Sequence, residues 1–188
     1  MTRPSITDII GIQDFAVLYR WEVIITPPTA LASYAASDLN VHAVSSEYPK
    51  YSNDEIEVSL AGHKVYQAGM RTYDPFTLTF VEDTKGTIQN FIKDWGSLMW
   101  TPGTGTQVAK SAYVAPTILL RPLDASNNAI HTYTLYNVWM QTHTIGNPDG
   151  GSNEVIKPEV TLRYDYLTED GQAISSIISN ATNLINLL

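Results

Sequence analysis

The apolar residues change their spacing between Ala68 and Trp95. In the first part every second residue is apolar, the period of a half-buried β-strand; these residues are Phe76, Leu78 and Phe80. Farther along, the apolar positions follow the three-and-four spacing of one helix face; these residues are Ile88, Phe91, Ile92, Trp95 and Leu98. Possible helix caps precede that face: Asp83, Thr84 and Thr87. The segment therefore predicts a turn, a strand and a helix, in that order.

Most of the remaining chain shows the alternation of strands. We expect a short helix over residues 5–12, and strands over 18–26, 40–48, 55–60, 65–67, 113–123, 130–140 and 155–167. Gly62-His63 is expected to turn the strand 55–60 back on itself. Residues 101–106 are rich in Gly and Pro, which predicts a mobile or partner-ordered loop.

About six to eight strands with one central helix predict a mainly β fold: an antiparallel β-sandwich or small barrel, with the helix packed on its side or end. The chain has 188 residues, of which 44% are apolar, enough for one globular domain. We expect residues 1–170 to form this β domain and residues 171–188 to form a C-terminal extension.

The extension has the pattern of an uncharged amphipathic helix. Its apolar residues keep three-and-four spacing and oppose Ser and Asn; they are Ile174, Ile177, Ile178, Ala181, Leu184, Ile185 and Leu188. An exposed apolar stripe of this length would aggregate, so its own barrel, a neighbouring subunit or another protein must cover it.

Charge and composition exclude several functions. The formal charge is −8, and the 11 basic residues are scattered singly, so a phosphate-binding surface for nucleic acid is disfavoured. The chain has no Cys, so disulfides and thiolate metal sites are excluded, which is compatible with folding in a reducing cytoplasm. No apolar run reaches the ~18 residues of a membrane span, and the N-terminal residues lack a secretory pattern, so no membrane anchor is expected.

Candidate catalytic groups are few. The four His lack the close spacing of zinc ligands; they are His42, His63, His131 and His143. Glu82 and Asp83 could form an acid–base pair, but neighbours on a strand point to opposite faces and Asp83 suits a helix cap. The loop carrying Asp149, Asn153 and Glu154 lacks the spacing of a calcium loop, and Gly103-Thr104-Gly105 is not followed by the Lys of a phosphate loop. We expect no catalytic residue, metal or cofactor.

The aromatic residues admit two interpretations. Trp21, Trp95 and Trp139 fall on periodic apolar faces and are expected in the core, whereas Trp100 adjoins the Gly-rich loop and is the likeliest to lie at an interface. The same aromatic residues, with 11 Tyr, could instead line a sugar-binding groove.

Two short motifs resemble the tube-forming proteins of contractile phage tails. The first is an Ala-Gly-x-Arg-Thr-aromatic-Asp turn before a Thr-alternating strand and a helix ending in Asp-Trp; its matching residues are Gly69, Arg71, Thr72, Asp74, Asp94 and Trp95. The second resembles the closing strand of that family; its matching residues are Asn153, Glu154, Asp165 and Tyr166. The family usually ends near the Asp-Tyr motif, so residues 171–188 depart from its pattern.

The resemblance implies a structural protein, not an enzyme. Copies would form hexameric rings whose sheets join edge to edge, and the rings would stack into a tube inside the tail sheath. Its other partners would be a baseplate initiator or hub, a tail terminator, and the tape measure protein and DNA in the lumen, which it would not bind specifically. The protein would be part of the virion, assembled in the host cytoplasm.

Candidate contact and lumen residues follow from this interpretation. Candidates for contacts between subunits are Tyr48, Tyr51, Trp100, Ile177, Ile178 and Leu184, with the segments 40–53, 101–110 and the N-terminus contacting the next ring. The acidic residues Asp54, Glu55 and Glu57 could face the lumen, or could belong to an ordinary solvated strand face.

Three alternatives remain open. A baseplate tube initiator of the same fold would occur once per tail and use residues 171–188 to grip the hub. The same fold could instead serve a bacterial secretion system or a tailocin. A monomeric carbohydrate-binding β-sandwich belongs to a different class altogether.

Overall fold

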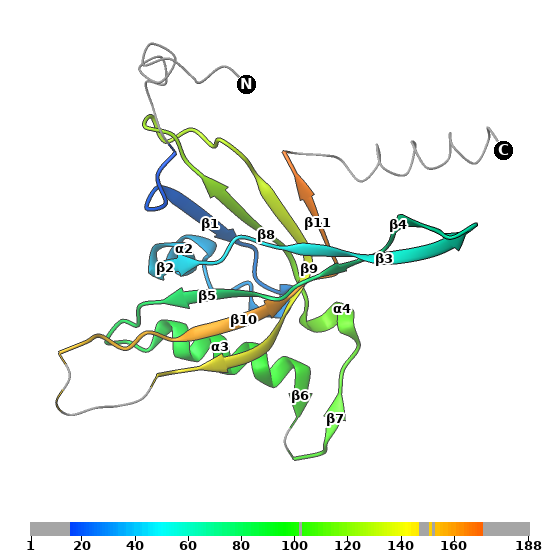
Figure 1. The fold of residues 1–188 in the computed structure, drawn as a ribbon. Helices are drawn as coiled ribbons and strands as arrows, with labels where there is room; N and C mark the ends of the chain where they lie inside the picture. Colours follow the sequence, from blue (N-terminus) through cyan, green and yellow to red (C-terminus); the bar gives the residue numbers. More distant parts are fainter. Residues whose placement is uncertain (1–15, 102, 147–150, 152, 171–188) are drawn as a thin grey trace, which may run out of the picture.

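The computed structural model describes residues 16–101, 103–146, 151 and 153–170, and these are mainly β (Figure 1). The strands are β1 (Trp21–Ile25), β2 (Ala43–Ser46), β3 (Tyr51–Leu60), β4 (His63–Tyr73), β5 (Phe76–Phe80), β6 (Trp100–Thr101), β7 (Thr106–Gln107), β8 (Ala115–Pro122), β9 (Tyr133–Thr144), β10 (Glu159–Arg163) and β11 (Tyr166–Glu169). The helices are η1 (Thr29–Leu31), α2 (Ala36–His42), α3 (Thr87–Met99) and α4 (Lys110–Tyr113). The helices expected over 5–12 and 171–188 lie outside the described residues.

Seven strands form one antiparallel sheet in the order β1-β8-β9-β10-β5-β2, with β11 also paired to β9. The long strand β9 joins two halves of this sheet. Its first part, from Tyr133, pairs with β8 and β11, and its second part, from Trp139, pairs with β10. Near the junction of these parts, Asn137 has φ 53°, a left-handed conformation within the continuous strand. The expected antiparallel, mainly β fold with one central helix is confirmed.

The core lies between the inner faces of this sheet and α3. Every second residue of β5 is buried, and β1, β8, β9 and β10 also contribute apolar residues. The helix contributes its predicted face: Ile88, Phe91, Ile92 and Trp95 are at most 3% exposed. At Gly96 the helix comes close to β9, since a Cβ there would lie 3.5 Å from the methyl carbon of Met140. The periodicity of residues 76–98 therefore identified the centre of the core.

Two adjacent carboxylates hold the start of α3. Asp83 accepts hydrogen bonds from the backbone N–H (3.0 Å) and the hydroxyl (2.8 Å) of Thr87. Glu82 accepts from the N–H groups of Ile88 (3.0 Å) and Gln89 (2.8 Å). Both negative charges lie at the positive end of the helix dipole. The capping role of Asp83 is confirmed, and Glu82 is a second capping group that sequence reasoning missed.

Three expected elements differ in the structure. The expected strand 40–48 begins as helix α2, because Leu39 is fully buried there and the side-chain oxygen of Asn40 accepts from the N–H of Ile25 at 3.0 Å. The expected loop 101–106 connects the short paired strands β6 and β7. The closing strand 155–167 is divided into β10 and β11, which pair with different parts of β9.

Candidate interaction surface

The most prominent surface feature is the hairpin of β3 and β4, which extends away from the rest of the fold on the right of Figure 1. The two strands pair with each other from Tyr51↔Tyr73 to Leu60↔His63, and neither joins the main sheet. All ten residues of β3 are exposed. The expected turn is confirmed, but it is formed by Ala61 and Gly62, and His63 already belongs to β4.

The tip of the hairpin is a tight turn formed by Ala61 and Gly62, with φ 49° and 81°. Positive φ at both central residues is the conformation of a type I′ turn, whose twist matches that of paired strands. The alternation that predicted a strand over 55–60 therefore belongs to a free hairpin, whose apolar side nothing in the described part of the chain covers.

The first part of the first motif, residues 68–73, lies within this hairpin and is not the expected turn. Residues 68–73 belong to β4, and the register shifts by one residue between Asn53 and Glu55, which makes a β-bulge. A Cβ on Gly69 would lie 3.1 Å from the carbonyl oxygen of Asp54, so the bulge needs glycine there. On the side of the bulge nearer the hairpin base, Arg71 donates from Nε to the side-chain oxygen of Asn53 at 3.0 Å.

An aromatic cluster fixes the base of the hairpin to the core. The Tyr73 ring lies 6.4 Å from the Tyr51 ring and 5.6 Å from the Tyr164 ring. The Tyr164 hydroxyl donates to the carbonyl of Lys50 at 3.1 Å, and the same carbonyl accepts from the N–H of Asp74 at 3.0 Å. Burial, with the nearby Asp74 charge, raises the pKa of Tyr164 to about 12. These contacts set the direction in which the hairpin leaves the body.

The two faces of the hairpin differ in chemistry. The first face carries Glu55 and Glu57, and Glu57 pairs with Lys64 at 2.9 Å. The second face carries an apolar group that we call the apolar hairpin face: Ile56, Val58, Leu60 and Val65. Because neighbours on a strand point to opposite sides, Asp54 does not share a face with Glu55 and Glu57. The three candidate lumen residues therefore cannot all line one surface.

The main sheet also has unpaired edges among the described residues. The strand order begins at β1 and ends at β2, and β11 pairs with β9 alone. Each outer edge leaves a row of backbone N–H and C=O groups that another strand can pair with.

The second family motif holds the bend between β10 and β11. Asp165 accepts from the Lys110 ammonium and, at 3.0 Å, from the amide of Asn137. The ring of Tyr166 stacks on that of Tyr136 at 4.5 Å and 14°. These contacts connect the bend between β10 and β11 to residues 136–137 of β9. The motif residues Asn153 and Glu154 lie, exposed, in the segment before β10.

Asp94 and Trp95 of the first motif both attach α3 to neighbouring segments. The hydroxyl of Tyr34 donates to Asp94 at 2.6 Å, and this bond, followed by burial, raises the pKa of Tyr34 to about 12. The Trp95 indole N–H donates to the carbonyl of Tyr113 at 2.7 Å. Both residues therefore have structural roles.

The remaining contact candidates lie in different places. The Tyr48 ring packs 5.8 Å from the Tyr133 ring, close to the hairpin base. Trp100 is on β6 and is 52% exposed, partly covering Gly105. Ile177, Ile178 and Leu184 lie outside the described residues. The structure thus groups Tyr48 and Tyr51 near the hairpin base, whereas Trp100 belongs to the separate β6–β7 hairpin.

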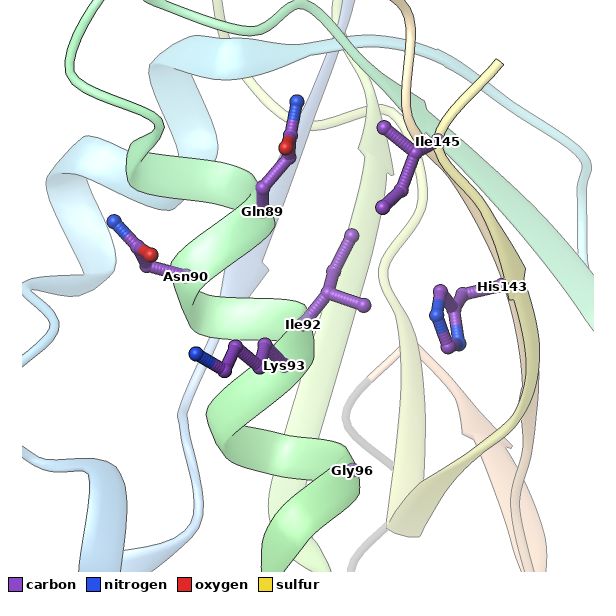
Figure 2. A pocket seen from close by; sticks show the side chains of 7 residues that line it. All are labelled: Gln89, Asn90, Ile92, Lys93, Gly96, His143 and Ile145. Atoms are coloured by element: carbon purple, nitrogen blue, oxygen red, sulfur yellow. The ribbon is translucent and has the colours of Figure 1, made fainter. Parts of the chain in front are cut away.

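A cavity of about 390 Å³ lies between α3 and the end of β9 (Figure 2). Its polar side chains are Gln89, Asn90, Lys93 and His143, and its lining includes no carboxylate or hydroxyl nucleophile.

In the described part of the chain, no three His, Asp or Glu side chains are grouped as metal ligands. No described helix is long and apolar enough to cross a membrane.

Comparisons with known proteins point in one direction. No family model matches the sequence. The tail tube protein of Serratia phage KSP90 is 26% identical over 124 residues, which cover 65% of this chain and 70% of that protein.

Solved structures share the fold at low sequence identity. A chain of the sheath–tube complex of an extracellular contractile injection system, PVC, in the extended state, has a TM-score of 0.64 at 18% identity and covers 88% of this chain and 98% of its own. A chain of the anti-feeding prophage cap has a TM-score of 0.62 at 18% identity, and the match covers 85% of this chain and 97% of that one. A chain of the anti-feeding prophage baseplate has a TM-score of 0.59 at 14% sequence identity, and the match covers 90% of this chain and 97% of that one. The chain is therefore similar in sequence to a phage tail tube protein and shares its fold with chains of contractile injection systems.

Proposed function

We propose that this protein is the structural subunit of the inner tube of a contractile phage tail. The observation that carries the proposal is the β3–β4 hairpin, which extends from a core of tail-tube fold with one apolar face uncovered. An exposed apolar face of this kind is typical of a surface that binds another chain, and neighbouring copies in a ring can bury it.

Copies would join laterally through their open strand edges. The outer edges of β1, β2 and β11 have no strand partner in the described residues, and pairing between copies satisfies their backbone groups. The anti-feeding prophage baseplate, which contains a chain of this fold, was symmetrised six-fold, which supports hexameric rings for this chain. Rings would then stack into a tube.

The partners of the tube follow from the particles in which the similar chains occur. Those particles include a sheath–tube complex, a baseplate and a tube-terminating cap. This chain would accordingly contact a tail sheath protein outside, a baseplate initiator or hub below and a terminator above. It would act within the virion after assembly in the host cytoplasm.

The lumen would conduct the tape measure protein and then DNA without binding either. The chain carries a formal charge of −8, and Glu55 and Glu57 share the polar hairpin face. With this face turned inward, its carboxylates would repel phosphates over about 8–10 Å. DNA would then pass without adhesion, and the protein would need no catalytic group.

Electron microscopy of the purified full-length protein tests this function. We expect rings or tubes at high concentration or with a baseplate initiator. Val58→Asp, on the apolar hairpin face, should abolish them while leaving the β-sheet signal in circular dichroism unchanged. The matched control is Ser59→Asp, which adds the same charge on the polar face and should still assemble. A wild-type protein that stays monomeric under all these conditions would contradict the proposal.

The second candidate is a tube initiator at the baseplate, favoured by the baseplate chain whose fold matches 90% of this chain. Copy number separates the two functions. Quantitative mass spectrometry of intact particles should find many rings of a tube subunit, but a single ring of an initiator.

A further inference from the structure

The apolar hairpin face leaves four large side chains in water. Ile56, Val58, Leu60 and Val65 are 47%, 41%, 65% and 56% exposed. They lie on one side of the hairpin, with Val58 directly opposite Val65. An apolar group of this kind indicates a surface that is covered in the working protein.

The sequence contains a segment of matching chemistry. Residues 171–188 include no Asp, Glu, Lys or Arg, and their apolar residues have helical three-and-four spacing. As a helix the segment would be about 27 Å long. The hairpin from Tyr51 to Leu60 is about 30 Å long. By the same rise per residue, the apolar hairpin face from Ile56 to Leu60 is about 13 Å long. It would cover about half of the helix, and neither this face nor the segment contains Asp, Glu, Lys or Arg.

The described chain ends close to the hairpin base. Glu169 pairs with Tyr133, and the N–H of Asp170 donates to the carbonyl of Thr132 at 2.8 Å. The Tyr133 ring is 5.8 Å from that of Tyr48, which precedes β3 by three residues. Figure 1 shows the end of β11 on the same side of the body as the hairpin. The segment that follows Asp170 thus starts near the base of the hairpin, and the apolar hairpin face lies farther out, toward the tip.

We propose that residues 171–188 pack as a helix along the apolar hairpin face of their own chain. The stripe containing Ile177, Ile178 and Leu184 would contact Val58 and its neighbours, and the Ser and Asn residues would face water. This docking goes beyond the proposed function and does not depend on it. In a tube subunit, it would keep the face out of water until a neighbouring copy replaced the helix, and that replacement does rest on the proposed function.

Cysteine labelling of the full-length chain tests the docking, because the chain has no Cys of its own. Val58→Cys reports on the apolar hairpin face and Ser59→Cys on the polar face. At concentrations where the protein is monomeric, maleimide should react with the thiol of Val58→Cys on the order of tenfold more slowly than with that of Ser59→Cys. Equal rates would overturn the proposal.

Changes in the segment itself separate docking from other causes of protection. Added to the Val58→Cys chain, Ile177→Asp combined with Leu184→Asp should raise the labelling rate to that of the Ser59→Cys chain. Ser176→Asp combined with Asn183→Asp adds the same charge on the polar side and should leave the protection intact. Protection that survives the first pair would overturn the proposal.

A cross-link identifies the chain that supplies the segment. The pair Val58→Cys and Ile178→Cys should form a disulfide within one chain on mild oxidation, whereas Ser59→Cys with Ile178→Cys should not. A disulfide formed only between chains would overturn docking within the same chain. Because these measurements use monomers and ring formation is read by electron microscopy, failure of the docking and failure of the proposed function are distinguishable.

Discussion

Gly69 lies so close to Asp54 that a Cβ on the glycine would be 3.1 Å from the Asp54 carbonyl oxygen. The neighbouring atoms are backbone, which cannot rotate away as a side chain can. The glycine of the family motif is thus required by the bulge of a long hairpin, at a position where the sequence indicated a turn.

Gly69→Ala should therefore destabilise the protein by about 1 kcal/mol, because the clash must shift backbone atoms of β3. Urea unfolding followed by circular dichroism measures the change. Gly103→Ala is the matched control, since a Cβ there has no atom within 4 Å. Equal stability of Gly69→Ala and the wild type would contradict the requirement for glycine at this bulge.

Tyr164 supports the hairpin base through both its ring and its hydroxyl. Tyr164→Phe should cost about 1 kcal/mol because the Lys50 carbonyl loses its hydroxyl donor. Tyr164→Ala should cost about 3 kcal/mol or more, since the side chain is 6% exposed and its removal leaves a cavity. Tyr19→Phe, at a residue 74% exposed, is the neutral reference. Unfolding in urea ranks the three variants, and the reverse order would contradict the assigned contacts.

Stability should fall in alkaline solution. The pKa of Tyr164 is raised to about 12 by burial, and that of Tyr34 to about 12 by its bond to Asp94, from an ordinary value of 10.0. The fold favours the neutral phenols, so their contribution is complete below pH 10 and is lost as pH rises through about 12. The free energy of unfolding, measured against pH, should decline over that range. The double variant Tyr34→Phe and Tyr164→Phe should show a smaller decline.

The start of α3 should be sensitive to acid. Hydrogen bonds from the backbone and hydroxyl of Thr87 lower the pKa of Asp83. A lowered pKa means that this contribution is present above the ordinary value and is lost as pH falls through the folded one. Asp83→Asn should therefore lower Tm at pH 7, and the difference from wild type should shrink in acid.

The polar hairpin face provides a test of the proposed lumen. Tubes carrying Glu55→Lys and Glu57→Lys should retain DNA at low salt and release it as salt rises, because basic groups bind phosphates by counterion release. Asp54→Lys is the control on the opposite face. Retention is measured as fluorescent DNA that co-sediments with assembled tubes. Equal retention by both variants would contradict a lumen lined by the polar face.

The alternation of residues 76–80, followed by helical spacing to residue 98, correctly located the central strand, the main helix and their buried faces. Such patterns are readable because periodicity records the side of an element that meets the core. Asp83 was recognisable as a cap for a similar reason, since capping acts between residues close in sequence. Glu82 was not recognised, because its partners are six and seven residues away.

What the sequence determined by itself is local: the strands, the helix, the hairpin turn and two motifs that resemble those of contractile tail tube proteins. Only the tertiary structure decided that Ile56, Val58 and Leu60 are uncovered, that Ala68–Tyr73 is strand, and that β9 serves both halves of the sheet. Alternation reports that a strand has an apolar side, but burial depends on what lies opposite. That partner is set by contacts between residues far apart in the chain, such as Tyr164 with Lys50.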